Sequence, residues 1–301
     1  MISRVADNLF WLGRYIERAE ATARLLAEHH QLLIEDRSVP EALAARILLE
    51  ALSMPTEGAT TARDMVKRVV GKDADPSSIT GAVSSARANA RAVRDSLSQD
   101  TFEALNSAHI ALTRGIAFTS SPGVALHRVL ERLLVVNGVV DWTMPRDQAF
   151  QFMVLGRELE RIDLVGRLLD IRHEEWWPAS GPSAVLRSSG ALSPFLRTGQ
   201  PMTSVNVRKY LVLDPAFPRS MRSCAADAEN AVRSLQALGA SDSSQLLREV
   251  GMLRSELEYA MISSSGDVDL HVETTRAAAV RAHEEVRRAF FRQHGTIVWS
   301  H

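Results

Sequence analysis

Cysteine and lysine are both scarce in this chain of 301 residues. The single cysteine, Cys224, excludes an internal disulfide and any metal site built from several thiolates, and it suits a reducing cytoplasm. Only Lys67, Lys72 and Lys209 are lysines, whereas the other cationic side chains are arginines. Biased codon usage explains this preference more simply than selection for arginine's planar fork, although that fork suits carboxylate and phosphate groups.

Long apolar runs and a strong net charge are absent as well. No run approaches the ~20 apolar residues that a membrane-spanning helix needs. Arg4, Asp7 and Arg14 interrupt the region where a secretory signal peptide has its uncharged core. The formal net charge of -1 gives no reason to expect nucleic acid or an anionic membrane as a partner. We therefore expect a soluble, cytoplasmic protein.

Strand patterns and common catalytic motifs are missing too. No segment alternates apolar and polar residues as a half-buried strand does, so the periodicity predicts an all-α fold. The sequence lacks a P-loop, an ATP-grasp nucleotide site and the Gly-x-Ser-x-Gly elbow of serine hydrolases. It also lacks the Glu-x-x-His pairs of di-iron helical bundles. We expect neither a cofactor nor a metal.

Two segments repeat each other at a separation of 143 residues. Residues 12–26 read LGRYIERAEATARLL and residues 155–169 read LGRELERIDLVGRLL, so the Gly-Arg and Glu-Arg pairs recur without a gap. Pro76 and Pro218, each expected to start a helix, recur at a separation of 142. These repeats predict a duplicated antiparallel helical bundle. We expect two six-helix repeats, 1–143 and 144–301, packed as one globular unit about a pseudo-two-fold axis.

The repeated segment carries a stripe of arginine and glutamate side chains on one side of its helix. A solvated surface with ion pairs is the ordinary explanation of such a stripe, but large apolar residues such as Phe10 and Trp11 lie among the charges. We therefore predict that the two segments cover each other. Their buried charges must then pair, because leaving one unpaired costs about 3–5 kcal/mol. The stripe is either a structural ion-pair network, which we favour, or an anion-binding site.

The N-terminal run resembles the bacterial alpha-E family, which takes its name from its helical content and its Glu-Arg motif. The resemblance rests on Ser3-Arg4-x-Ala6-Asp7-Asn8-Leu9-Phe10-Trp11 followed by Gly13-Arg14-Tyr15-x-Glu17-Arg18-Ala19-Glu20. Residues 76–79, 156–161 and 217–220 fit as well, so it covers nearly the full length. Val165-Gly166 departs from the pattern, where Thr-Ala is common.

Alpha-E proteins are typically encoded beside, or fused to, circularly permuted ATP-grasp proteins, and often near transglutaminase-like peptidases. The resemblance therefore implies a part in a system that makes or modifies peptide or amide bonds. It implies an ATP-grasp protein as partner and a transglutaminase-like peptidase as a further candidate. It implies no defined catalytic role.

The candidate site consists of charged residues from both repeated segments and from the family motif. Glu17 and Glu160 are the candidates for acid/base chemistry. The candidates for substrate binding are Arg14, Arg18, Arg24, Arg157, Arg161, Arg167, Asp7, Asn8 and Arg219. We expect an accessory subunit that positions a carboxylate- or phosphate-bearing substrate between the two repeats. The alternatives are an enzyme in its own right and a purely structural ion-pair network.

Overall fold

The fold is all-α in the part of the chain that the computed structural model describes, which is residues 3–71, 75–113, 122–240 and 243–291. The helices are α1 (Ser3–Glu35), α2 (Glu41–Ala51), α3 (Ala62–Val70), α4 (Ile79–Ala92), the short 3₁₀ helix η1 (Arg94–Ser96), α5 (Gln99–Thr113), α6 (Pro122–Thr143), α7 (Gln148–Asp170), α8 (His173–Trp176), α9 (Gly181–Ser189), α10 (Leu192–Arg197), α11 (Ser204–Leu213), α12 (Met221–Ala237), α13 (Ser244–Glu258) and α14 (Ser265–Phe290). Sequence periodicity therefore predicts the fold class correctly.

The starts of α4 and α12 correct the sequence prediction. We expected Pro76 and Pro218 to begin these helices, but both prolines lie in the turns before them. The helices begin after Ser78 and Ser220, whose side chains accept a hydrogen bond from the third helical N–H at 3.0 Å. A serine at this position satisfies a backbone donor that the first turn leaves without a partner, which decides the boundary.

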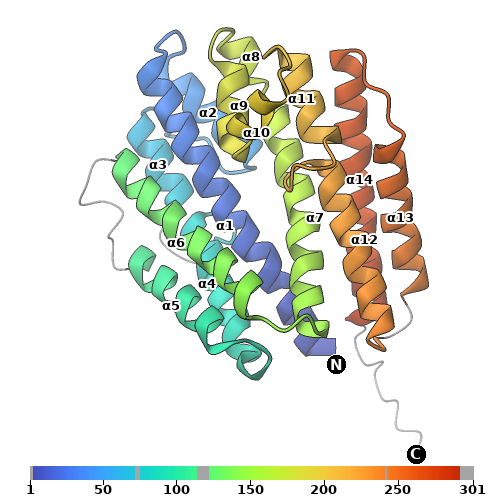
Figure 1. Cartoon of the computed structure of the whole chain (residues 1–301). Coiled ribbons are helices and arrows are strands. Elements are labelled where there is room, and N and C mark those ends of the chain that lie inside the picture. Colours follow the sequence, from blue (N-terminus) through green and yellow to red (C-terminus); the bar gives the residue numbers. More distant parts are fainter. Residues whose placement is uncertain (1–2, 72–74, 114–121, 241–242, 292–301) are drawn as a thin grey trace, which may run out of the picture.

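Helices α1 and α7 pack against each other and carry the two repeated segments. α4 and α6 pack on α1, whereas α12 and α14 pack on α7. In Figure 1 the cyan-to-green helices lie on the left, the orange-to-red helices lie on the right, and α1 and α7 run between them. The repeated segments are therefore inside the molecule, as the apolar residues among their charges predict.

Two glycines allow this close packing. A Cβ atom added to Gly13 of α1 would overlap the carbonyl oxygen of Met153 on α7, and one added to Gly156 would overlap the carbonyl oxygen of Phe10 on α1. A side chain at either position would force the two helix backbones apart. The glycine in each repeated segment thus sets the distance between α1 and α7.

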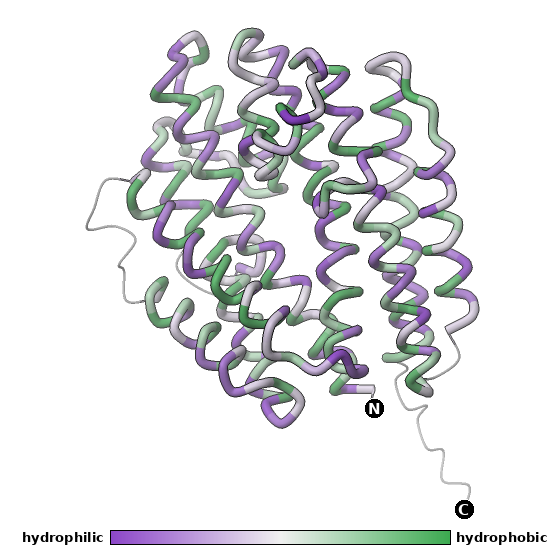
Figure 2. The backbone as a smooth tube through the Cα atoms, in the orientation of Figure 1, coloured by the Kyte–Doolittle hydropathy of each residue, from purple (hydrophilic) through white to green (hydrophobic). Residues whose placement is uncertain are grey.

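The apolar core is continuous through both groups of helices and includes Leu9, Leu12, Leu155 and Leu159 at the centre. Figure 2 shows hydrophilic and hydrophobic residues alternating along the helices. This pattern is typical of amphipathic helices that bury one face and expose the other. Among the described residues, no helix is long and apolar enough to span a membrane.

Candidate functional site

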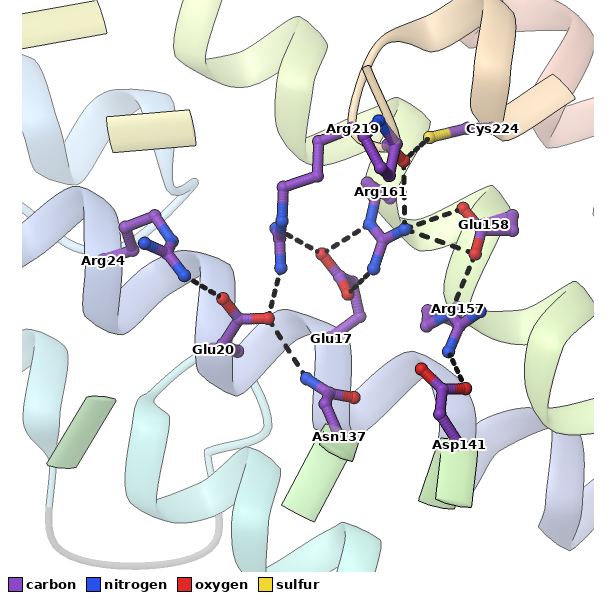
Figure 3. Close-up of polar contacts among 11 residues, drawn as sticks. Glu17, Glu20, Arg24, Asn137, Asp141, Arg157, Glu158, Arg161, Arg219 and Cys224 are labelled. Atoms are coloured by element: carbon purple, nitrogen blue, oxygen red, sulfur yellow. Dashed lines mark hydrogen bonds and ion pairs between the residues drawn. The ribbon is translucent and has the colours of Figure 1, made fainter. Parts of the chain in front are cut away.

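Glu17 lies at the centre of the contact between α1 and α7, and its side chain is fully buried. Its carboxylate accepts hydrogen bonds from Nε and Nη2 of Arg161 at 3.0 and 2.7 Å, and from Nη1 of Arg219 at 2.9 Å (Figure 3). Burial acts to raise the pKa of Glu17, but Arg161 and Arg219 outweigh burial and lower it to about 2. Glu17 is therefore ionised at neutral pH.

Glu160, the equivalent residue on α7, is bound by two arginines of α1. It accepts from Nε of Arg18 at 2.5 Å and from Nε of Arg14 at 2.6 Å. Arg18 thus pairs with Glu160 while Arg161 pairs with Glu17, so each Glu-Arg pair binds the other. We call this set of residues, 14–24 of α1 and 157–167 of α7 with Arg219, the Glu–Arg junction.

The turns before α4 and α12 also reach the Glu–Arg junction. Nη1 of Arg161 donates to the carbonyl oxygen of Pro218 at 3.3 Å, and Nη1 of Arg18 lies 3.5 Å from that of Pro76. The prolines that recur in the sequence therefore contact equivalent arginines. Their role is to present a carbonyl to a buried guanidinium, not to begin a helix.

Glu20 extends the junction along α1. Its buried carboxylate accepts from Nη2 of Arg24 at 2.7 Å and from the side-chain amide of Asn137 on α6 at 3.1 Å. Arg219 donates to it as well, so this one guanidinium bridges Glu17 and Glu20 (Figure 3). Arg219 comes from the turn before α12 and connects that turn to α1 through both glutamates.

Asp163 holds the equivalent position on α7. It accepts from Nε of Arg167 at 2.7 Å and from Nε of Arg276 on α14 at 3.1 Å. Burial acts to raise the pKa of Asp163, but the two arginines outweigh burial and lower this pKa below its ordinary value. Arg167 also donates to the hydroxyl of Ser53 at 2.8 Å, which places it at the edge of the junction.

Glu158 is a buried member of the junction that the sequence analysis missed. It accepts from Nη1 of Arg161 at 3.0 Å and from Nε of Arg157 at 2.8 Å, and Arg157 reaches Asp141 at 3.2 Å (Figure 3). The equivalent residue in the first segment is Tyr15, so the repeat gave no signal for a second carboxylate there. Glu158 explains how Arg157 and Arg161 can lie close together in the interior.

Two other candidates, Asn8 and Asp7, precede the junction on α1. The side-chain amide of Asn8 donates to the carbonyl oxygen of Arg4 on its own helix at 2.6 Å. Asp7 lines a cleft at the N-terminal end of α1. Cys224 lies near Glu158, and burial raises the pKa of its thiol well above the ordinary value, which keeps it a protonated thiol. Among the described residues, no group of three or more His, Cys, Asp or Glu side chains is placed to hold a metal ion.

A small cavity of about 30 Å³ lies beside the Glu–Arg junction. A water molecule needs roughly 10–15 Å³ of such space, so the cavity holds about two water-sized groups. Its walls are mainly apolar side chains of α1 and α7, and its polar lining includes Glu17, Arg161 and Arg219. The buried hydroxyl of Ser188 also lines it and has no hydrogen-bond partner among the residues described.

An open cleft of about 800 Å³ lies between the first turns of α1 and the last turns of α14. It contacts the junction through His283, whose Nδ1 lies 3.2 Å from Nη1 of Arg14. The sequence gives no signal for His283, because a histidine in an amphipathic helix is usually an ordinary core residue. Its contact with Arg14 depends on how α14 packs on α7 and α1.

Comparison with known proteins agrees with the repeated Glu-Arg pairs. A family model described as "a predicted alpha-helical domain with a conserved ER motif" matches residues 1–291. Uncharacterized proteins of Mycobacterium bovis and Mycobacterium tuberculosis are 27% identical over 252 residues, covering 72% of this chain and 28% of each relative. The chain thus spans less than a third of the length of these relatives. No solved structure gives a significant match.

Proposed function

The chain belongs to the Alpha-E family, and we propose that it is an accessory subunit of an ATP-grasp-associated system that forms or modifies peptide or amide bonds. In this role it positions a carboxylate- or phosphate-bearing substrate at the Glu–Arg junction for a circularly permuted ATP-grasp protein, with a transglutaminase-like peptidase as a second partner. The mycobacterial relatives support a linked domain or partner, because more than two thirds of each lies outside the match. The single Cys224 supports a cytoplasmic setting.

The observation that supports an accessory role is the pairing of every motif carboxylate. A general acid or base needs a pKa near the working pH and a free position toward substrate. Glu17 has a pKa of about 2 and accepts three hydrogen bonds from Arg161 and Arg219, and Glu160 is held by two arginines. These contacts favour an anchoring role for the glutamates over the enzyme alternative.

The cavity beside the junction supports binding of a substrate's end group. Its volume of about 30 Å³ admits a few non-hydrogen atoms, which suits a carboxylate better than a phosphate. Arg219 and Arg161 supply cationic donors at this cavity, and Ser188 supplies a hydroxyl without a partner. The rest of the substrate would extend toward the partner subunit.

We also propose that residues 1–143 and 144–301 are duplicated repeats related by a pseudo-two-fold axis. The support is reciprocal contact: Arg18 binds Glu160 while Arg161 binds Glu17, and each glycine of the motif faces the other helix's backbone. Exchanging the two segments leaves this set of contacts unchanged. An unrelated pair of helices would have no reason to show it.

Co-expression with a circularly permuted ATP-grasp protein from the same genome tests the accessory role. We expect co-elution of the two proteins and a higher ATP-dependent turnover in the complex than with the ATP-grasp protein alone. Arg219→Ala should raise the KM for substrate about tenfold, because a charge-assisted hydrogen bond contributes about 1.5–3 kcal/mol to binding. Arg46→Ala is the matched control, because Arg46 is an exposed arginine of α2 outside the junction. Absence of a complex, together with turnover indifferent to this chain, would refute the proposal.

Glu17→Gln separates this role from the enzyme alternative. If Glu17 transfers a proton, the variant loses turnover even where it is folded, because an amide cannot exchange the proton. If Glu17 anchors the junction, the main effect is a lower free energy of unfolding. Turnover per folded molecule, measured beside a melting curve, distinguishes these two results.

A further inference from the structure

The open cleft between α1 and α14 has the size of a ligand site and lies outside the Glu–Arg junction. Its volume of about 800 Å³ falls within the range of small-molecule sites in proteins, about 300–1,000 Å³. Trp11 and Phe291 contribute aromatic surface, and Asp7, His283 and Arg287 contribute polar groups.

His283 offers the cleft a neutral N–H donor. Its ring stacks on Phe10 with centroids 5.5 Å apart, and Nδ1 lies 3.2 Å from the Arg14 guanidinium. Because a guanidinium can only donate, Nδ1 must accept, and the neutral ring carries its proton on Nε2. Burial, together with Arg14 and Arg287, lowers the pKa of His283 to about 4, so this tautomer persists at neutral pH.

Arg287 is the cation of the cleft with free donors. It is exposed on the last turn of α14, and among the described residues no carboxylate lies within ion-pair distance of it. Arg288, its neighbour, is held by Glu285. The arginines of the junction differ, because Arg14, Arg161 and Arg219 each already donate to a buried carboxylate. Arg287 interacts electrostatically with Asp7 of the same cleft, but an incoming anion can bind its guanidinium without breaking an ion pair among the described residues.

The two acidic residues of the cleft restrict which anion fits. Asp7, half-buried beside Trp11, and the exposed Glu284 would repel a ligand that carries only negative charge. A ligand that carries an N–H group as well as a carboxylate can bind both the acidic and the cationic side chains of the cleft. The aromatic surface of Trp11, which stacks on Tyr15 at 5.4 Å, suits an apolar side chain beside those groups.

We propose that this cleft binds the carboxylate end of a peptide-like molecule. The carboxylate lies on the Arg287 guanidinium and the Nε2–H of His283, the neighbouring amide N–H donates to Asp7, and the terminal side chain packs on Trp11. The site is distinct from the Glu–Arg junction and does not depend on an ATP-grasp partner. A null result at the junction would leave this proposal standing.

Calorimetric titration of the full chain with N-acetylphenylalanine tests the proposal. We expect saturable one-to-one binding, and binding at least tenfold weaker for N-acetylphenylalanine amide, which lacks the carboxylate. Arg287→Ala and His283→Phe should each weaken binding about tenfold, the second while keeping the ring that packs on Phe10. Arg281→Ala is the control, because Arg281 is exposed on the same helix and does not line the cleft.

Three outcomes would overturn the proposal. Equal affinity for the acid and its amide would show that no carboxylate is recognised. Inorganic phosphate competing as strongly as N-acetylphenylalanine would show a general anion site. Unchanged affinity in Arg287→Ala would show that the ligand binds outside this cleft. In that case the indole N–H signal of Trp11 in nuclear magnetic resonance spectra would not shift as the ligand is added.

Discussion

Replacing Glu17 by glutamine should destabilise the fold more than the same change at Glu160. Glu17 is fully buried, and the side chains of its partners Arg161 and Arg219 are 10% and 17% exposed, whereas the partners of Glu160, Arg14 and Arg18, are 15% and 23% exposed. Water can therefore replace part of what Glu160 contributes. At the Glu17 side, removal of the charge leaves arginines in the interior with fewer acceptors.

The magnitude follows from the pKa of Glu17. A fall from 4.5 to about 2 corresponds to about 3 kcal/mol of stability at neutral pH, at about 1.4 kcal/mol for each unit. Breaking a buried ion pair costs about 3–5 kcal/mol, which agrees. With an unfolding entropy of about 2.1 cal/mol/K per residue, Glu17→Gln should lower the melting temperature by about 5 °C. For Glu160→Gln we expect about 1–2 kcal/mol.

The dependence on pH gives a second measurement of the same effect. The folded pKa of Glu17 lies below the unfolded one, so its contribution is complete above about pH 4.5 and is lost as the pH falls toward 2. Urea unfolding of the wild type and Glu17→Gln should therefore converge over this interval. Equal losses for Glu17→Gln and Glu160→Gln at pH 7, or a loss below about 1 kcal/mol for the former, would refute the reasoning.

Three further variants test the packing and the buried histidines. Gly13→Ala should cost at least about 2 kcal/mol in urea unfolding, because its methyl group would overlap the Met153 carbonyl. Gly138→Ala should stabilise by about 1 kcal/mol, because this glycine within α6 has open space around it; a loss there would show an unseen contact. Neither ring nitrogen of the buried His173 has a hydrogen-bond partner among the residues that the structure describes, and burial lowers its pKa to about 3. The neutral ring's contribution to the free energy of unfolding is therefore complete above about pH 6.5 and declines as the pH falls below that value. The free energy of unfolding of His173→Phe should therefore rise by about 2 kcal/mol relative to that of the wild type between pH 7 and pH 5. If the two proteins lost stability in parallel over this interval, the prediction would be contradicted.

Local sequence patterns predict much of the fold because they act within a helix. The spacing of apolar residues gives the helices themselves, and the position of the glycine in both repeats marks where α1 and α7 approach. The predicted starts of α4 and α12 were wrong, because a proline and a serine that lie close together, such as Pro76 and Ser78, both favour the beginning of a helix. Only the hydrogen bond that the backbone N–H of Gly81 donates to the Ser78 hydroxyl oxygen shows that the helix begins after the serine.

The charged site was predictable only where the repeat itself carries information. The identity of Glu17-Arg18 with the later Glu-Arg pair indicates two equivalent surfaces, and apolar neighbours indicate that they are covered. Glu158 and His283 break that equivalence, since neither has a counterpart in the repeated segment. Their contacts with Arg157, Arg161 and Arg14 arise from tertiary packing, which a repeat in one sequence does not encode.

The contrast between junction and cleft follows from how each arginine is partnered. A buried guanidinium must have its acceptors at hand during folding, so the arginines that hold α1 to α7 can bind a ligand only through the donors that their carboxylates leave free. An exposed arginine such as Arg287 keeps its donors hydrated and can exchange water for a carboxylate at small cost. Arg14 lies between these cases, because it binds Glu160 on one side and His283 on the other. It therefore fixes the tautomer that faces the cleft while serving the junction, and connects the two sites through one side chain.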